Sequence, residues 1–333
     1  MRNRRPWNGF IKYSALLLIW SAVVIAGLEL GLRLINRIRG GELGYSIVKG
    51  SYIIPSTAPG LYVELNPQMS DRLVRVNSHG FRGEEFPIAK PAGELRIGIV
   101  GDSVPFGLGI PQSDIVSEVL SWRLREAHPG RPIRVINAGV PSYNASQALA
   151  MADYRLAAFK PDATVAFLNL TDFYPPTCVR ASEGLPRILF RNSALFRAAF
   201  LASVKLQSEF SSEENYRWLQ ANIAAVRTFF ARAKQYPVRN YIVIYRRPQT
   251  PGNHDANDLF MTKLAAESGA EWLDVCDVLL KRFKSLDDIG ISATDGHLNT
   301  EATAVLAAEI QRRMESAGLF GPPPTTGSAE ARP

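Results

Sequence analysis

From Leu95 onward, short β-rich apolar runs alternate with helix-length amphipathic segments, and this alternation limits the possible folds more than any other feature of the sequence. The runs that predict strands lie at 95–100, 133–136, 163–168, 241–245 and 272–275. The segments with a helical period lie near 113–127, 145–159, 215–235, 256–268 and 300–316. Strands that alternate with helices favour a mostly parallel sheet covered on both faces, so the sequence predicts an α/β fold.

Polar residues follow the predicted strands at the points where the chain leaves the sheet. In an open α/β sheet, ligands bind outside the carboxyl ends of the strands. Four such places contain Gly101-Asp102-Ser103, Asn137–Tyr143, Asn169–Asp172 and Thr294–Asn299. We therefore expect polar groups from four loops to meet at one edge of the sheet.

Ser103 and His297 are the residues in these loops that could perform nucleophilic catalysis together. A serine hydroxyl becomes a useful nucleophile only when a neighbouring base takes its proton. Of the four histidines, His297 is the strongest candidate base, because Asp295 two residues earlier can orient its imidazole. His254 is a secondary candidate.

The same stretch has a purely structural interpretation. Asp295 to His297 could form the turn before the last helix, with Asn299 or Thr300 as its N-cap. The position of Ser103 at the same edge of the sheet favours the catalytic interpretation.

Other kinds of site lack their sequence patterns. The chain has no Gly-x-Ser-x-Gly nucleophile elbow, no dinucleotide-binding fingerprint and no Gly-Lys-Ser/Thr phosphate loop. No cluster of His, Cys and carboxylate residues has the spacing of metal ligands. We therefore expect no metal ion and no nucleotide bound through either of these motifs.

The N-terminal part predicts a membrane anchor. Tyr13–Leu32 carries a single charge, at Glu29, and twenty helical residues span about 30 Å, the thickness of a bilayer core. A cleaved signal peptide is the alternative, although the segment is long for one and no clear cleavage site follows it. We predict an uncleaved transmembrane helix over 13–35, after a basic tail over 1–12.

The positive charge of the chain is concentrated at that end. The net charge is +7, and residues 1–40 contain seven basic side chains and one acidic side chain. The rest of the chain is close to neutral, so the sequence argues against a nucleic-acid partner.

The remaining segments are assigned from composition. Residues 36–94 are rich in Gly and Pro and predict a stalk or irregular lead-in to the main domain, which covers 95–317. The tail 318–333 contains a run of three prolines and predicts disorder. Cys178 and Cys276 allow either one disulfide or two buried thiols, and the sequence leaves both open.

Taken in order, four short blocks resemble those of the SGNH/GDSL hydrolase family. The blocks are Gly101-Asp102-Ser103, Asn137–Tyr143, Thr171-Asp172 and Asp295-Gly296-His297. The chain is more narrowly similar to the bacterial membrane-anchored branch, through Glu29–Arg33 at the end of the apolar helix and Asn77–Gly83 before the domain.

The resemblance implies a flavodoxin-like three-layer sandwich with a five-stranded parallel sheet, and an ester hydrolase or acyltransferase that needs no cofactor. It implies that Ser103 attacks the acyl carbonyl, His297 acts as base and then acid, and Asp295 orients His297. It also implies a single-pass protein of the inner membrane with its domain in the periplasm or outside the cell. From that location alone, the expected substrate is an acyl ester on an envelope glycan, such as an O-acetyl group.

Two residues depart from the family pattern in the expected oxyanion hole. Ser142 stands where the family has Gly, and Thr171 stands where it has Asn. Asn169, two residues from Thr171, is a possible replacement donor, and loss of one such donor costs about 10²–10³ in rate. The alternative function is therefore a weakened or inactive protein of the same fold, acting as a carbohydrate-binding or assembly subunit in the envelope.

Overall fold

The computed structural model of the chain describes eleven segments: residues 7–39, 52–67, 69–175, 188–189, 192–196, 198–199, 212–233, 239–245, 256–285, 288–292 and 295–320. The chain divides into two compact units. One contains Met1–Pro55 and Thr177–Ser208, and the other contains Ser56–Pro176 and Glu209–Pro333.

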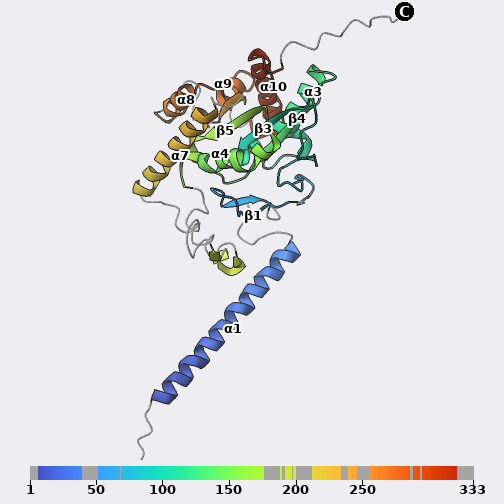
Figure 1. The fold of residues 1–333 in the computed structure, drawn as a ribbon. Coiled ribbons are helices and arrows are strands. Elements are labelled where there is room, and N and C mark those ends of the chain that lie inside the picture. Colours follow the sequence, from blue (N-terminus) through green and yellow to red (C-terminus); the bar gives the residue numbers. More distant parts are fainter. Residues whose placement is uncertain are drawn as a thin grey trace, which may run out of the picture. The chain divides into compact units, whose positions relative to one another are not determined.

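A five-stranded parallel sheet forms the centre of the second unit (Figure 1). Its strands are β3 (Leu95–Gly101), β4 (Ile133–Gly139), β5 (Ala163–Asn169), β6 (Arg239–Tyr245) and β7 (Glu271–Asp274). Their order across the sheet is β4-β3-β5-β6-β7, so the chain reverses its direction of winding between β3 and β5. This order is that of flavodoxin-like folds, and the predicted α/β fold with five parallel strands is confirmed.

Helices cover both faces of the sheet. The longer ones are α3 (Val116–Ala127), α4 (Ala145–Tyr154), α7 (Ser212–Ala233), α8 (Ala256–Ser268) and α10 (Thr300–Ser316). Successive side chains of β3 point to opposite faces of the sheet. Ile97 and Ile99 point to the face that α3 and α10 cover, where they belong to one core cluster with residues of these helices. Gly98 faces the other side, where a Cβ would lie 2.2 Å from Leu156 Cδ2.

Several short elements were not expected from the sequence. They are β1 (Ile53–Pro55), β2 (Val63–Leu65), β8 (Gly290–Ser292), β9 (Asp295–Leu298), α2 (Ser103–Phe106), α9 (Val275–Leu279) and the 3₁₀ turn Leu170–Phe173. Two further 3₁₀ turns, Gln112–Asp114 and Leu156–Phe159, lie at the ends of the helical segments predicted near 113–127 and 145–159. Strands β8 and β9 pair antiparallel. The stretch before the last helix is therefore a small hairpin, where the sequence suggested a plain loop.

Residues 56–67 and 69–94 of the lead-in segment belong to the second unit. Leu61, Val74, Phe81 and Arg82 are at most 3% exposed. These four side chains are as buried as core residues. In the described residues from 56 to 94, the strand structure before β3 is limited to β2 and isolated bridges.

The tail begins packed. Phe320 is 6% exposed, and its ring stacks on His128 with centroids 4.2 Å apart. Residues 321–333 and Cys178 lie outside the described part of the chain, and Cys276 is buried. The prediction of a disordered tail is therefore wrong for residues 318–320 and stays a prediction beyond them, and the choice between a disulfide and two buried thiols stays open.

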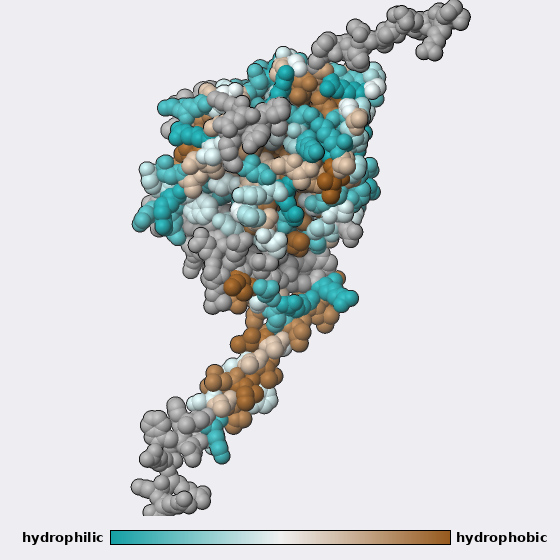
Figure 2. Space-filling model, viewed as in Figure 1, coloured by the Kyte–Doolittle hydropathy of each residue, from teal (hydrophilic) through white to brown (hydrophobic). Residues whose placement is uncertain are grey.

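Helix α1 (Trp7–Arg39) is the main element of the first unit. Within it, Lys12–Ile35 is long and apolar enough to cross a membrane, and none of that window is buried. Figure 2 shows the apolar surface of this helix in brown. Such a helix is compatible with a membrane anchor or a signal sequence.

Candidate active site

Ser103 is placed by the tight turn that ends β3. Gly101 has φ +150°, and a Cβ there would lie 2.7 Å from Pro105 Cγ and 2.9 Å from Phe167 Cβ. Asp102 is the N-cap of α2 and accepts a hydrogen bond from the N–H of Val104 at 2.9 Å. The small residue and the cap together put Ser103 at the first position of α2, with its hydroxyl at the carboxyl edge of the sheet.

His297 is held by its own hairpin. It lies on β9, and Asp295 Oδ1 accepts from the backbone N–H of His297 at 3.0 Å and lies 2.6 Å from its Nδ1. Asn299 follows as the N-cap of α10 and accepts from the N–H of Ala302 at 2.9 Å. The capping role considered for Asn299 and the contact between Asp295 and His297 are therefore both present.

The two elements meet at the edge of the sheet. His297 Nε2 lies 2.8 Å from Ser103 Oγ. With Nδ1–H donated to Asp295, Nε2 of the neutral ring is the acceptor for the hydroxyl proton of Ser103. Burial by itself would raise the pKa of Asp295, but the hydrogen bonds and the charge of His297 outweigh it and lower that pKa. Asp295 therefore stays ionised and can stabilise a protonated imidazole.

A second polar group joins the Ser103 turn to the loop after β5. Asn169 Nδ2 donates to Asp102 Oδ2 at 2.7 Å, and the N–H of Asn169 donates to Asp172 Oδ2 at 2.9 Å. Asp102 is 9% exposed and Asp172 2%. Burial raises the pKa of both carboxyls, and the charge of Asp102 adds to the effect on the pKa of Asp172. Asn169 thus separates two buried carboxyl groups and donates to each.

Thr171 and Asn169, both predicted as oxyanion donors, use their side chains within this loop. Thr171 Oγ1 donates to Asn169 Oδ1, which also accepts from the N–H of Thr171 at 2.7 Å. Since an amide oxygen can only accept, the hydroxyl proton of Thr171 points toward Asn169. Neither side chain is aimed as a free donor toward Ser103 in this arrangement.

Ser142 has φ +72°, one of two non-glycine residues with positive φ in the described part of the chain. That region strongly favours glycine because a Cβ crowds the backbone there. The turn around it adjoins the Ser103 turn, since the N–H of Val140 donates to Gly101 O at 3.1 Å. A serine at position 142 therefore strains the backbone where a glycine would not. It removes no hydrogen-bond donor, because serine has the same backbone N–H as glycine.

Arg82 is a residue that the sequence interpretation left without a role. It is 1% exposed, and its backbone N–H donates to Asn137 O at 3.1 Å. Its guanidinium lies 4.8 Å from the ring centroid of Phe106. The guanidinium donates to five oxygens. Four are backbone carbonyl oxygens, of Phe106 (2.8 Å), Gly107 (2.6 Å), Leu73 (2.8 Å) and Ile110 (2.9 Å), and the fifth is Oε1 of Gln112 (3.1 Å). Arg82 therefore holds the C-terminal end of α2, the helix that Ser103 begins.

The signal for Arg82 was present in the sequence. It is the arginine of the stretch Asn77–Gly83, which carried part of the family resemblance. A cation in such a stretch does not by itself reveal that it is buried. His254 lies outside the described residues.

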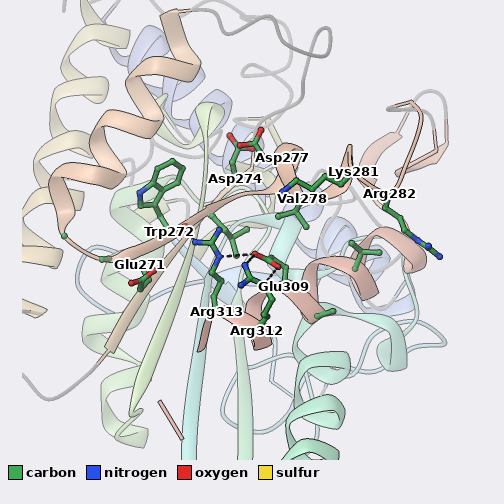
Figure 3. A pocket seen from close by; sticks show the side chains of 15 residues that line it. Glu271, Trp272, Asp274, Asp277, Val278, Lys281, Arg282, Glu309, Arg312 and Arg313 are labelled. Carbon is green, nitrogen blue, oxygen red and sulfur yellow. Dashed lines mark hydrogen bonds and ion pairs between the residues drawn. The ribbon is translucent and has the colours of Figure 1, made fainter. Parts of the chain in front are cut away.

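A pocket of about 1100 Å³ lies away from Ser103, beside the edge strand β7 and between α9 and α10 (Figure 3). Its lining includes Trp272 and several charged residues. Arg312 and Arg313 point toward Glu309 and bond it at 2.6 and 3.0 Å (Figure 3). These contacts lower the pKa of Glu309 to about 2. Ser103 and His297 do not line this pocket.

Among the residues that the structure describes, no group of three or more His, Cys, Asp or Glu side chains is arranged to hold a metal ion.

Comparisons with known proteins give matches among solved structures. No protein-family model matches the chain, and no curated protein matches it. A lipase/acylhydrolase from Enterococcus faecalis is 16% identical, with a TM-score of 0.44 over 67% of this chain and 96% of that one. A catalytic mutant of an acetylxylan esterase from Geobacillus stearothermophilus is 16% identical, with a TM-score of 0.43 over 68% and 96%.

A psychrotrophic esterase from Pseudoalteromonas sp. is 14% identical, with a TM-score of 0.42 over 67% of this chain and 97% of that one. These values are too low to support an inference about activity. The side chains around Ser103 are therefore the basis on which we infer a function.

Proposed function

We propose that this protein is a membrane-anchored serine ester hydrolase of the SGNH type. The observation that carries the proposal is the chain of contacts from Ser103 Oγ to His297 Nε2 at 2.8 Å and from His297 Nδ1 to Asp295 Oδ1 at 2.6 Å. A nucleophile, a base and a carboxylate in this order are the parts that acyl transfer through serine requires.

In the proposed reaction, Ser103 Oγ attacks the carbonyl carbon of the ester while His297 Nε2 takes the hydroxyl proton. The tetrahedral intermediate collapses when His297 returns that proton to the leaving alcohol, and the acyl group remains on Ser103. Water then attacks the acyl group, again through His297, and releases the acid. If a sugar hydroxyl replaces water in this step, the same residues perform acyl transfer.

The negative charge of the intermediate needs donors placed before the reaction begins. We assign this role to the backbone N–H groups of Ser103 and Ser142. Thr171 becomes a third donor only if its hydroxyl turns away from Asn169. Asn169 is better suited to hold Asp102 than to contact the substrate, because its amide nitrogen donates to that carboxylate.

We assign α1 to a single crossing of the inner membrane, with the second unit in the periplasm or outside the cell. The length and apolar surface of Lys12–Ile35 support the crossing, and the side follows from the family resemblance alone. An acyl ester on an envelope glycan is the substrate that this location favours. A reporter active only after export, fused after Pro333, should be active, and activity from a cytoplasmic reporter alone would reject the orientation.

A fluorophosphonate probe tests the nucleophile directly, since it reacts with activated serines. We expect the full chain to be labelled at Ser103 and the Ser103→Ala variant not to be labelled. Ser113→Ala is the matched control, because Ser113 is exposed and its hydroxyl donates to the neighbouring residue Asp114, away from the candidate site. Label on another residue, or no label on the wild type, would reject the assignment.

The hydrogen bond from Thr171 to Asn169 favours one second candidate, a carbohydrate-binding or assembly subunit with the same fold. That protein would keep Ser103 and His297 but lack a complete oxyanion hole. It predicts no label at Ser103 and no turnover over a broad panel of esters, together with measurable binding of acylated glycans.

A further inference from the structure

Glu29 is the only acidic residue in the apolar window of α1, and a second segment of the same unit holds its carboxylate. The hydroxyl of Ser193 donates to Glu29 at 2.8 Å, and the N–H groups of Ala194 and Leu195 donate at 2.9 and 2.8 Å. Arg33, one turn along α1, donates at 2.7 Å. The described residues between 188 and 199, which we call the Glu29-bound segment, therefore lie beside the end of α1 (Figure 1).

Some of the described residues of this segment also pair their polar groups with one another or with α1. The N–H of Ser193 donates to Leu189 O at 2.8 Å, and Asn192 Nδ2 donates to Ile188 O at 2.8 Å. Arg33 Nη2 donates to Asn192 O at 2.5 Å. Such pairing is needed by any part of a segment that enters the hydrocarbon region of a bilayer, because no water is present there to replace lost hydrogen bonds.

Apolar side chains of the segment remain uncovered. Ile188 is 57% exposed and Leu189 is 37% exposed. Between Gly184 and Ser208 the sequence contains ten large apolar residues and no acidic residue, and its four basic residues are Arg187, Arg191, Arg197 and Lys205. Basic segments rich in large apolar residues bind at the surface of membranes that contain anionic lipids.

The depth of Glu29 agrees with such a location. Glu29 lies six residues before Ile35, the end of the apolar window, which corresponds to about 9 Å along a helix. Segments that lie in the membrane interface bury their apolar side about 5–10 Å into the boundary between headgroups and acyl chains. The hydrogen bonds to Glu29 would hold the segment within that layer.

We propose that the Glu29-bound segment is a membrane-interface element. It lies on a lipid surface that carries anionic headgroups, with Ile188 and Leu189 in the acyl-chain boundary and Glu29 fixing it to α1. The proposal depends on the membrane crossing of α1 proposed above. In this arrangement the first unit contacts the bilayer at two places in the sequence, α1 and the Glu29-bound segment.

A depth measurement on the full chain in lipid nanodiscs tests the proposal. Ile188→Cys is labelled with an environment-sensitive fluorophore in a Cys178→Ser background, in which Cys276 is 2% exposed and protected from the label. We expect strong quenching by nitroxide on the lipid acyl chains and weak quenching by aqueous iodide. Discs of phosphatidylcholine with phosphatidylglycerol should give more acyl-chain quenching than discs of phosphatidylcholine alone.

Glu29→Ala tests the attachment to α1, with Arg37→Ala as the matched control. Both residues lie on α1, but only Glu29 contacts Ser193, Ala194 and Leu195. In the Glu29→Ala variant, we expect acyl-chain quenching of the label to fall at least twofold and iodide quenching to rise. The Arg37→Ala variant should behave like the parent protein.

The outcomes separate this proposal from the membrane anchor itself. If alkaline carbonate leaves the chain in the membrane but the label is quenched by iodide and not by acyl-chain nitroxide, the interface element is rejected and the anchor stands. Protection from both quenchers would indicate a protein partner and would also reject it. If carbonate releases the chain, or the mature chain begins near residue 27, both proposals fail.

Discussion

Asn169 Nδ2 donates to Asp102 Oδ2 at 2.7 Å, across 67 residues of sequence. This hydrogen bond joins the loop after β5 to the cap of α2, so Ser103 depends on a residue that does not touch it. The same loop carries Thr171, whose hydroxyl is turned toward Asn169. The properties of the candidate site therefore depend on how these two side chains divide their hydrogen bonds.

The first prediction concerns Asn169→Ala. Removal of the amide leaves the buried carboxylate of Asp102 without one donor, which costs about 2 kcal/mol of unfolding free energy. We expect the rate of fluorophosphonate labelling of Ser103 to fall as well, because the cap of α2 is loosened. Thermal unfolding and labelling rates measure the two effects. Thr171→Ala is the control, since it removes only the donor to Asn169, and an equal loss in both variants would contradict the role given to Asp102.

The second prediction concerns Thr171→Asn. An asparagine amide is longer and carries a donor that does not depend on one rotatable hydroxyl, so it should restore a third oxyanion donor. We expect kcat for an aryl acetate to rise, by up to about 10²-fold, with little change in KM, because the gain is made in the transition state. An unchanged kcat in a Ser103-dependent enzyme would show that Thr171 does not face the oxyanion.

The third prediction concerns Ser142, whose φ is +72°. Ser142→Gly relieves the crowding of Cβ, whereas Ser142→Ala keeps it, so the glycine variant should be more stable than the alanine variant by about 1 kcal/mol. Both retain the backbone N–H, and we expect both to keep the labelling rate of Ser103. Thermal unfolding compares the stabilities of the two variants. If Ser142→Ala is the more stable one, the backbone at position 142 is not strained by a Cβ.

The fourth prediction concerns Arg82→Lys. A lysine keeps the charge but cannot reproduce the five hydrogen bonds that the planar guanidinium makes. We expect the end of α2 to loosen and the labelling rate of Ser103 to fall at least tenfold. Arg75→Ala is the control, because Arg75 is exposed and pairs with Glu84 at 3.4 Å. If Ser103 in the Arg82→Lys variant is labelled at the wild-type rate, Arg82 does not position Ser103.

The fifth prediction concerns pH and Asp172→Asn. Burial raises the pKa of Asp172 in the folded protein, so the folded state binds a proton that the unfolded state releases at lower pH. The wild type therefore loses stability as the pH rises from the unfolded pKa to the higher folded one. The asparagine variant has no proton to lose but can still accept from the N–H of Asn169. We expect the melting temperature of Asp172→Asn, relative to that of the wild type, to rise from acidic to neutral pH. If the difference between the two melting temperatures does not change with pH, the prediction that Asp172 has a raised pKa is wrong.

The sequence alone was sufficient for the central sheet. Each predicted strand from 95–100 to 272–275 is present in the structure, with ends that differ by a few residues. Hydrophobic periodicity is a local property, and strands buried on both faces leave a strong apolar signal. The order of the strands does not follow from this alternation, because α/β folds with the same alternation have more than one strand order, and the flavodoxin-like arrangement was expected from the family resemblance.

The candidate site was only partly accessible from the sequence. Ser103, Asp295 and His297 could be named because strand ends in a parallel sheet share one edge, and the structure brings these three together. The catalytic roles of Ser103, Asp295 and His297, and the oxyanion roles of Ser142, Thr171 and Asn169, remain predictions for the experiments above.

Tertiary structure alone decided which partners the polar side chains take. The contacts of Asn169 with Asp102 and of Glu29 with Ser193 join residues 67 and 164 positions apart, and Arg82 is buried against carbonyls of another segment. A sequence shows that a side chain can donate or accept, but not which donor lies within 3 Å of it. That depends on the packing of distant elements, because a buried polar group must find its partner wherever the fold places one.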